Sequence, residues 1–316
     1  MKAVVYDRYG PPSVLRVADV PVPTLGAGQV LVEVVATSMN LSDWECLVGR
    51  PAYARIGGLR RPARPVLGSD VAGRVAAVGP GVTRFSQGDE VYGDNLGLKG
   101  GFAQFAVAPA SVLAPKPGSL TFAQASALPQ AGPIALQGTA GVGPGSRVAV
   151  NGAGGGSGSL AVQLAKAAGA HVTAVDNAGK LDFLRSLGAD AVVDHRVEDV
   201  TRLGPFDLVL DLVAHRSVRD YRRALAPGGR YLAVGGSVST MLSLLTAGTV
   251  LGRVSGRRLG VLAVKPGPDH FIPLEARYAS GEVRIHIDRE VSLDEVPEAL
   301  ASVGEGRVLG KVVVTP

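Results

Sequence analysis

The segment VAVNGAGGGSG, which ends at Gly158, has the composition and spacing of a turn that binds phosphate groups. Three apolar residues and an Asn predict a short buried strand, a glycine-rich turn follows, and residues 159–168 have the apolar pattern of a helix with a glycine at its end. Ala153, Gly155 and Gly158 occupy the first, third and sixth positions of the dinucleotide fingerprint, with Ala in place of the first Gly. Small residues there let a pyrophosphate approach the N–H groups at the start of the helix, so the turn predicts a dinucleotide site.

Further candidate contacts to a dinucleotide lie at the ends of three predicted strands. The strand Val172–Val175 ends in Asp176, where a carboxylate would meet the ribose of the adenosine. Val213-Ala214-His215 and Gly235-Gly236-Ser237 follow two later strands at their carboxyl ends, where an open parallel sheet has its ligand crevice. The candidate cofactor residues of the turn and these strand ends are Ala153, Gly155, Gly156, Ser157, Gly158, Asp176, Val213, Ala214, Gly235, Gly236 and Ser237.

The order of the predicted elements divides the chain into a β-rich part and an α/β part. Before residue 116 the strand-like segments are short and separated by Gly and Pro, with a long loop rich in Arg, Gly and Pro at 49–65. These segments are Lys2–Tyr6, Val14–Asp19, Gln29–Ser38, Val71–Val78 and Glu90–Tyr92. From Pro117 onward helical and strand patterns alternate, which is typical of a doubly wound parallel sheet.

Six strands are predicted for this sheet, and the rest of the chain adds four more elements. The later strands of the sheet are Ala191–Asp194, Leu208–Val213, Tyr231–Val234 and Leu259–Val264, with helices near Ser159, Leu181 and Ser217. After Lys265 we predict a helix at 270–279, a strand at 283–287, a helix at 293–302 and a strand at 311–314. We therefore expect a first domain over 1–116, a dinucleotide-binding domain over 117–264, and a segment, 265–316, that returns to the first domain.

The composition and charge of the chain indicate a globular protein and exclude several kinds of partner and site. At 316 residues the chain has about the length of two domains. The net charge of +5 is modest and no stretch interleaves basic with aromatic residues, so nucleic acid is not an expected partner. One cysteine excludes an internal disulfide and a four-cysteine zinc lobe. The first residues predict a strand rather than a signal peptide, and no apolar run approaches the ~20 residues that span a bilayer, so we expect a cytoplasmic protein without a membrane partner.

Motifs along essentially the whole chain resemble the zinc-independent quinone oxidoreductase and enoyl reductase group of the medium-chain dehydrogenase/reductase superfamily. They are MKAVVYDRYGPP at the start, ATSMNLSDW (36–44), LGSDVAGRVAAVGPGV (67–82), GDEVYGD (88–94), GGFAQFAV (100–107), ALPQAGPIALQG (127–138), the glycine turn with LAVQLAKAAGAHVTAV, and GKVVV at the end. The resemblance implies an α/β fold: a GroES-like, β-rich catalytic domain plus a Rossmann domain with a doubly wound parallel sheet. It implies a cleft between them where nicotinamide meets substrate, and it places Lys311 of the final motif among the cofactor-binding residues.

The resemblance also implies an answer about zinc. In zinc alcohol dehydrogenases of this superfamily the metal ligands stand at positions that are Asn40, Ser69 and approximately Gln130 here. Zinc in proteins takes thiolate, imidazole or carboxylate ligands, and Asp70 cannot hold a metal by itself. We therefore expect no catalytic zinc. Without a Lewis acid, alcohol oxidation is hard, whereas hydride delivery to an electron-poor conjugated carbon stays feasible.

Four residues of the β-rich domain are candidates for the catalytic step. Asn40 lies in the motif that borders nicotinamide and substrate in relatives, so its amide could hydrogen-bond a carbonyl oxygen that gains charge, or it could satisfy loop backbone. Asp43 could order this loop or cap the helix that follows. Tyr53 and Tyr92 could each donate a proton to an enolate from the cleft wall, or pack in the core.

The choice between NADPH and NADH stays open at this point. A carboxylate at Asp176 pairs with both ribose hydroxyls and repels a 2′-phosphate, which favours NADH. Lys180 stands where NADPH-using relatives keep a basic residue for that phosphate. His195 stands where many of them have a Tyr, and it could be a second contact to the phosphate. Lys180 could also be a solvated side chain.

The expected function is an NAD(P)H-dependent reductase that transfers hydride to a quinone or to the β-carbon of an α,β-unsaturated carbonyl. The alternative is a redox sensor or structural protein that binds NAD(P)H without turnover, which the Ile134 at a usual Thr position of the family would allow. A tailoring reductase with one bulky substrate is a third interpretation. Arginines 50, 55, 60, 61 and 64 crowd one loop, where they could receive an acidic or carrier-linked substrate or be solvated. The edge strand Leu259–Val264 predicts a homodimer.

Overall fold

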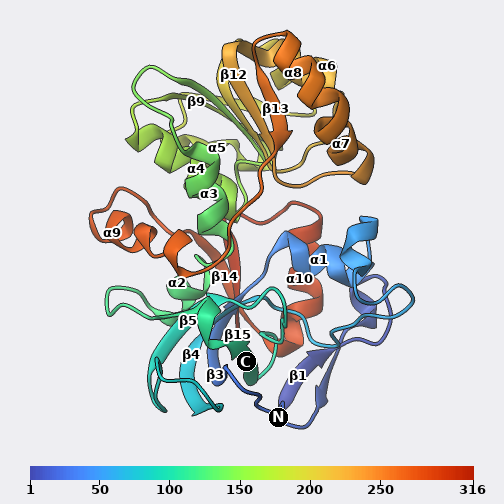
Figure 1. The fold of residues 1–316 in the computed structure, drawn as a ribbon, viewed down its shortest axis with the longest axis vertical. Helices are drawn as coiled ribbons and strands as arrows, with labels where there is room; N and C mark the ends of the chain where they lie inside the picture. The colour runs from blue at the N-terminus through green and yellow to red at the C-terminus, as the bar shows by residue number, and fades with distance from the viewer. The chain divides into compact units, whose positions relative to one another are not determined.

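A computed structural model describes residues 1–316, and the chain divides into two compact units (Figure 1). The first unit comprises Met1–Ala131, Pro266–Ala279 and Ile285–Pro316, and the second comprises Gly132–Lys265 with Ser280–Arg284. The segment 117–131, which the sequence pattern places in the second domain, therefore groups with the first. One reason is that the buried Ser38 hydroxyl lies 2.8 Å from the carbonyl oxygen of Ser126, so that its single hydrogen is shared between this carbonyl and the Asp70 carboxylate.

The first unit is built on a seven-stranded sheet and a two-stranded one. The larger sheet has the order β14-β15-β3-β4-β5-β7, and β6 pairs with β3; the smaller sheet pairs β1 with β2. Along β3 the side chains of Val30, Val32 and Val34 are buried at every second position, because successive residues of a strand face opposite sides. The strands are β1 (Lys2–Val5), β2 (Arg16–Asp19), β3 (Gln29–Ser38), β4 (Asp70–Val78), β5 (Glu90–Asp94), β6 (Phe105–Pro109), β7 (Leu113–Pro115), β14 (Ile287–Ser292) and β15 (Lys311–Thr315).

Four helices belong to the first unit: α1 (Leu41–Val48), α2 (Phe122–Ser126), α9 (Pro273–Ala279) and α10 (Val296–Gly304). Its short 3₁₀ turns are η1 (Pro12–Val14), η2 (Ala52–Arg55), η3 (Ala110–Val112), η7 (Pro268–His270) and η8 (Leu293–Glu295).

The predicted strand at 283–287 was wrong, since β14 begins at Ile287. Arg284 instead bonds Gln163 in the second unit, with its N–H donating to Oε1 (2.8 Å) and its carbonyl accepting from Nε2 (3.0 Å).

The second unit contains the doubly wound sheet that the sequence predicted. Its six strands run in the order β10-β9-β8-β11-β12-β13, and all neighbours are parallel. The strands are β8 (Arg147–Asn151), β9 (His171–Asp176), β10 (Ala191–Asp194), β11 (Phe206–Asp211), β12 (Leu225–Ala233) and β13 (Arg258–Val261). The sixth strand is confirmed, although it ends at Val261 rather than Val264.

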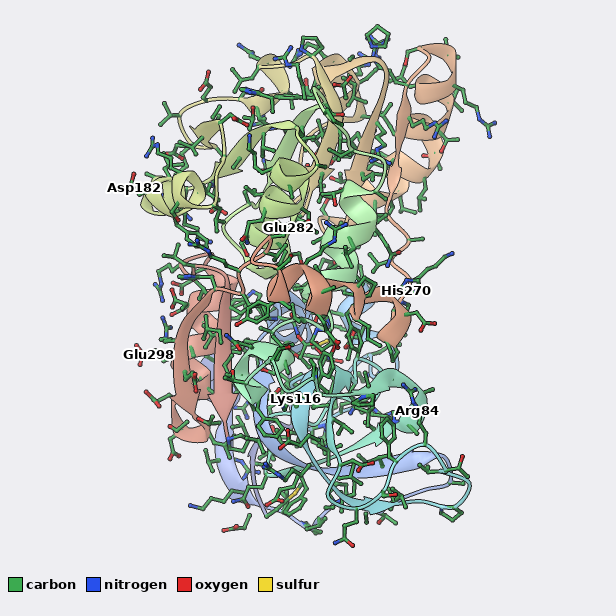
Figure 2. The ribbon with its side chains drawn as sticks, turned by 90° about the vertical axis from the view of Figure 1, so that its left-hand side faces the viewer. Arg84, Lys116, Asp182, His270, Glu282 and Glu298 are labelled. Atoms are coloured by element: carbon green, nitrogen blue, oxygen red, sulfur yellow. The ribbon has the colours of Figure 1, made fainter.

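Helices precede or connect these strands. They are α3 (Ala131–Thr139), α4 (Gly156–Ala167), α5 (Leu181–Ser186), α6 (Val218–Ala224), α7 (Val238–Ser243) and α8 (Thr249–Val254), with a π-helical segment η6 (Leu244–Gly248) and the 3₁₀ turns η4 (Ala178–Lys180) and η5 (Val200–Arg202). Charged side chains such as Asp182 on α5, and Arg84 and Glu298 of the first unit, point to the outside (Figure 2). Among residues 1–316 we find no helix with the length and apolar character needed to cross a bilayer.

Candidate active site

The glycine-rich turn lies between β8 and α4, as predicted. Gly152 has φ +80°, and the N–H groups of Gly152 and Ala153 both donate to the carbonyl of Val175 at 3.0 Å. A Cβ at Gly158 would lie 2.3 Å from the Gly152 carbonyl oxygen, so only glycine lets α4 pack this closely on the turn. Helix α4 begins after Gly155, and the N–H groups of its first turn have no carbonyl within the helix to bond. These residues fit a pyrophosphate.

Asp176 and Lys180 are both buried beside this turn, with exposed fractions of 8% and 5%. One carboxylate oxygen of Asp176 accepts from the Gly154 N–H at 2.8 Å. The other accepts from the Asn177 N–H at 2.9 Å and lies 3.5 Å from the Lys180 ammonium. The Lys180 side chain crosses Gly154, where an added Cβ would come within 2.5 Å of its Cδ. The negative charge of Asp176 therefore has a counter-charge within the protein, the Lys180 ammonium. Lys180 is buried, so it is not the solvated side chain that the sequence allowed.

The other predicted cofactor loops meet at the carboxyl edge of the sheet. The Ala214 N–H donates to the Gly235 carbonyl at 3.0 Å, and Ala214 forms a parallel bridge with Gly236. Asp211 orders this edge because its carboxylate accepts from the Val213 N–H at 3.1 Å and from Asn151 Nδ2, in the strand before the glycine turn, at 2.8 Å. Two further positions have different surroundings. Ser237 caps α7 by accepting from the Thr240 N–H, and the side chain of His195 is exposed.

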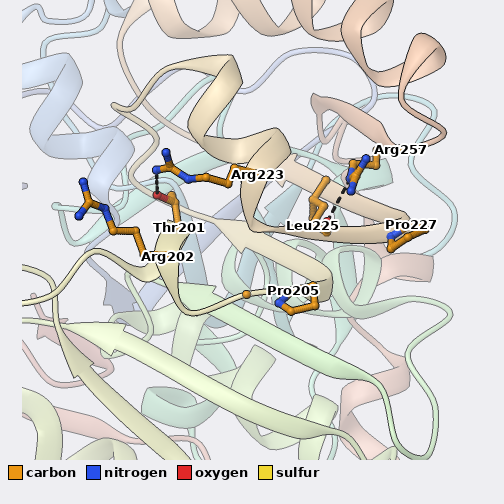
Figure 3. Close-up of a pocket in the computed structure, with 8 residues that line it drawn as sticks. Thr201, Arg202, Pro205, Arg223, Leu225, Pro227 and Arg257 are labelled. Atoms are coloured by element: carbon orange, nitrogen blue, oxygen red, sulfur yellow. Dashed lines mark hydrogen bonds between the residues drawn. The ribbon is translucent and has the colours of Figure 1, made fainter.

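A cavity of about 640 Å³ lies at the opposite, amino edge of the same sheet (Figure 3). Its lining includes Gly204, Pro205, Leu225 and Pro227, which immediately precede or begin β11 and β12. The remaining lining residues are Thr201, Arg202, Arg223 and Arg257. The Arg223 guanidinium donates to the Thr201 hydroxyl (3.2 Å) and to the Asp220 carboxylate (3.2 Å), so the positive charge of Arg223 is balanced within the protein. This cavity is separate from the glycine turn.

In the first unit, three side chains at the positions of the superfamily's zinc ligands come together. The Ser69 hydroxyl accepts a hydrogen bond from Asn40 Nδ2 and another from Gln130 Nε2, each at 3.2 Å. The Ser42 hydroxyl donates to Gln130 Oε1 at 3.0 Å. Amide N–H groups and hydroxyls are not zinc ligands, and no group of three His, Cys, Asp or Glu side chains in residues 1–316 could hold a metal. This donor set does not fit zinc.

A buried ion pair completes this polar cluster. The Asp70 carboxylate accepts from Ser38 Oγ (2.9 Å), Asn40 Nδ2 (2.9 Å) and the Gln130 N–H (3.0 Å), and it lies 3.3 Å from the Lys311 ammonium. Lys311 also donates to Asn40 Oδ1 at 2.5 Å. Burial raises the pKa of Asp70, against the opposing effects of Lys311, Asn40 and Ser38. The sequence placed Lys311 among the cofactor contacts, whereas the structure buries its ammonium in this cluster.

The same contacts change the expectation for Asn40. Its Nδ2 hydrogens are directed at Ser69 and Asp70, and its Oδ1 accepts from Lys311. Asn40 is only 8% exposed. An amide that is fully engaged in this way has no hydrogen left for a substrate carbonyl, because each amide group has two N–H donors.

Asp43 caps helix α1 and joins a second buried pair. Its carboxylate accepts from the Asn40 N–H at 3.0 Å and from the Gly68 N–H at 3.1 Å, and it lies 3.2 Å from the Lys99 ammonium. Burial alone would lower the pKa of Lys99, but Asp43 and Cys46 raise it. Nearby, burial and Asp70 raise the pKa of Asp94 to about 7. The geometry favours the structural alternative for Asp43.

The hydroxyls of the two candidate tyrosines both donate to carboxylates within the protein. Tyr92 is fully buried and its hydroxyl donates to the carboxylate of Glu275, which corrects the expectation that it faces a cleft. Tyr53 is 40% exposed, but its hydroxyl donates to Glu45 at 3.1 Å. Burial and the neighbouring carboxylates raise the pKa values of both phenols.

Lys99 is the residue of this cluster that sequence reasoning missed. It has φ +56° and is 7% exposed. A lysine is unusual in this backbone region, and its neighbours Gly97, Gly100 and Gly101 give the one local signal of a tight turn. Its partner, however, is distant in sequence, so nothing in the pattern pairs them.

Comparisons with known proteins agree with this architecture. Residues 26–118 match the family described as alcohol dehydrogenase GroES-like domain, and residues 187–314 match that described as zinc-binding dehydrogenase. The chain is 33% identical to a chloroplast envelope quinone oxidoreductase homolog of Arabidopsis thaliana, over 100% of this chain and 98% of that protein. It is 32% identical to an NADPH-dependent alkenal/one oxidoreductase, chloroplastic, of the same organism, over 90% and 79%. The solved quinone oxidoreductase from Coxiella burnetii covers 100% of this chain and 99% of its own, with 29% identity and a TM-score of 0.89.

Proposed function

Because this chain belongs to the quinone oxidoreductase and enoyl reductase group of the medium-chain dehydrogenase/reductases, we propose that it reduces quinones or α,β-unsaturated carbonyls with NADPH, without a catalytic metal. The observation that carries the proposal is the combination of a glycine turn whose close packing leaves room for a pyrophosphate with a polar cluster whose donor set does not suit zinc. When bound, the reduced nicotinamide supplies the hydride. The chain's own groups hold the nucleotide, orient the substrate and stabilise the charge that develops on the substrate oxygen.

Gln130 is our candidate for the group that stabilises this charge. It is partly exposed, and its Nε2 uses one of two hydrogens on Ser69, which leaves the second for a substrate oxygen. Asn40 and Asp70 act as positioning residues, because Asp70 fixes the Gln130 backbone and Asn40 shares Ser69 with its amide. This assignment replaces the earlier expectation that Asn40 donates directly.

Substitution at position 130 tests this role. We expect Gln130→Ala to lower kcat by roughly 10²–10³, as loss of one oxyanion donor does elsewhere, with little change in nucleotide affinity. Ser42→Ala is the matched control, since it removes the bond to Gln130 Oε1 and leaves the amide donor in place. Equal losses in the two variants would contradict the assignment.

The expected preference for NADPH over NADH follows from Asp176, because both oxygens of its carboxylate have partners within the chain. Its oxygens accept from Gly154 and Asn177 and its charge is balanced by Lys180, so it neither repels a 2′-phosphate nor offers an open acceptor to the ribose. A relative's name, NADPH-dependent alkenal/one oxidoreductase, supports the same choice.

Removal of the lysine provides the test of cofactor choice. Lys180→Met exposes the negative charge of Asp176, so the ratio of kcat/KM for NADPH to that for NADH is expected to fall at least about 100-fold. Lys166→Met is the control, since Lys166 pairs with Asp190 at 2.7 Å in the same unit. A ratio that stays constant in Lys180→Met, or that falls equally in the control, would refute this explanation.

The competing function is a redox sensor that binds the nucleotide without turnover, which Ile134 at a usual Thr position would allow. A panel of quinones and enones with NADPH distinguishes the two by loss of the reduced-nicotinamide absorbance. Oxidation of NADPH with at least one acceptor supports the reductase. Tight NADPH binding with no oxidation across the panel supports the sensor.

A further inference from the structure

The loop 50–65, which we call the arginine loop, follows α1 (Figure 1). Its sequence carries an unusual set of side chains. It contains five arginines, and no acidic residue occurs anywhere between Cys46 and Ser69. It also carries two of the most exposed large aliphatic side chains of the molecule, Ile56 at 83% and Leu59 at 79%. Neither feature contributes to the polar cluster or to the core.

The arginine loop is held in place by contacts that Gly58 and Arg55 make with Tyr9 and Gly49, which lie outside it. The Tyr9 hydroxyl donates to the carbonyl of Gly58, and the Arg55 guanidinium lies over the Tyr9 ring at 4.7 Å. Arg55 Nε also donates to the Gly49 carbonyl at 2.9 Å. One of the five arginines, Arg55, therefore fixes the loop. The segment that carries Ile56 and Leu59 is anchored by these contacts.

The other four arginines have no partner in the chain. Arg50, Arg60, Arg61 and Arg64 are exposed and make no side-chain hydrogen bond or ion pair in residues 1–316. Arg60 and Arg61 directly follow Leu59, so unpaired positive charge lies beside an exposed aliphatic side chain. Four unbalanced cations attract an anionic surface, and two exposed aliphatic side chains gain free energy when they leave water.

We propose that the arginine loop binds the surface of an anionic lipid bilayer, with Ile56 and Leu59 in the interfacial region and the arginines at the phosphate headgroups. Basic residues beside aliphatic ones are suited to this boundary, where headgroups and acyl chains meet. A stable protein partner would instead need a complementary surface of roughly 800 Å² per side, and the loop offers two isolated aliphatic side chains. This peripheral contact differs from a membrane span, and it revises our expectation of no membrane partner.

The proposal goes beyond the reductase activity and does not depend on it. The test is co-sedimentation of the full chain with vesicles of phosphatidylcholine, with and without phosphatidylglycerol. Binding is expected only to the anionic vesicles, and it is expected to weaken with salt because exposed charges are screened. Since each basic residue near such a surface contributes roughly a five-fold factor in partitioning, a triple variant of Arg60→Gln, Arg61→Gln and Arg64→Gln should lose about 100-fold.

Two control variants separate this loop from general charge and exposure effects. The first carries Arg196→Gln, Arg219→Gln and Arg222→Gln, which removes the same charge from exposed positions of the second unit. The second carries Val250→Ser and Val254→Ser, whose side chains are 64% and 83% exposed. Neither control should lose more than a few-fold, whereas Ile56→Ser with Leu59→Ser should lose about tenfold.

Three results would overturn the proposal. The first is equal binding to neutral and anionic vesicles. The second is equal loss in the loop and control variants. The third is a combination: the chain binds soluble polyglutamate, Ile56→Ser with Leu59→Ser leaves that binding unchanged, and anionic vesicles are not bound. This combination would identify the loop as a site for an acidic protein. Nucleotide binding, measured in parallel, should be unchanged in every loop variant because the loop lies outside the second unit.

Discussion

The buried pair of Lys311 and Asp70 should contribute strongly to the stability of the first unit. The two side chains are 6% and 0% exposed and their charged atoms lie 3.3 Å apart, so solvent does not screen them. Removal of one member leaves the other charge buried without a counter-charge. Lys311→Met is therefore expected to lower the free energy of unfolding by about 3–5 kcal/mol.

A double-mutant cycle isolates the interaction itself. Asp70→Asn alone should also cost about 3–5 kcal/mol, since the Lys311 ammonium is then buried without a counter-charge and keeps only the neutral acceptor Asn40 Oδ1 in this cluster. The double variant should be less destabilised than the sum of the single variants, by at least about 2 kcal/mol, since neither charge is then left alone.

The assay is urea unfolding followed by tryptophan fluorescence. Trp44 is the only tryptophan of the chain and packs against the core of the first unit, so its signal reports this unit. The control is the exposed pair Arg74–Glu90, with side chains 48% and 37% exposed, where coupling should stay below about 1 kcal/mol. Additivity within about 0.5 kcal/mol at Lys311 and Asp70 would refute the buried-pair reasoning.

Three further outcomes follow from the structure. The pKa of Asp94 is about 7 in the folded protein against an ordinary 3.8, so the free energy of unfolding falls as pH rises between these values. Asp94→Asn should therefore raise Tm, with a gain in the free energy of unfolding of up to about 4 kcal/mol at about pH 8 and a smaller gain at about pH 5. An equal gain at both pH values would contradict the shift. Gly158→Ala places a Cβ 2.3 Å from the Gly152 carbonyl oxygen, so calorimetry should detect no NADPH binding, and wild-type affinity would disprove the need for glycine. If β13 forms a homodimer, Val261→Lys should yield a monomer by light scattering, and a dimer that persists in the variant would exclude that edge.

The second unit could be predicted well because its signals are local. The glycine turn, the helix after it and Asp176 at the end of the next strand follow one another within a short segment. Alternation of strands and helices then determines a parallel sheet, because such connections are right-handed and short. What the sequence could not give was the state of Asp176, which depends on the rotamer of Lys180 across Gly154.

The polar cluster of the first unit could be predicted only in part. The positions of Asn40, Ser69 and Gln130 were identified through the family resemblance, and the capping role of Asp43 from its place near the start of a predicted helix, where the structure puts it in the first turn of α1. The contact of Lys311 with Asn40 joins residues 271 positions apart, so no local pattern encodes it. Buried polar groups take their partners from tertiary packing, which also explains why Tyr92 meets Glu275 instead of solvent.

The most direct test of the reductase proposal follows a labelled hydride. The protein, treated with a metal chelator, is mixed with NADPH that carries deuterium at the transferable position and with a reactive enone, and the product is analysed by mass spectrometry and NMR. We predict one deuterium at the β-carbon and a rate that the chelator leaves unchanged. Binding of NADPH without any product, or activity that the chelator abolishes and zinc restores, would contradict the account.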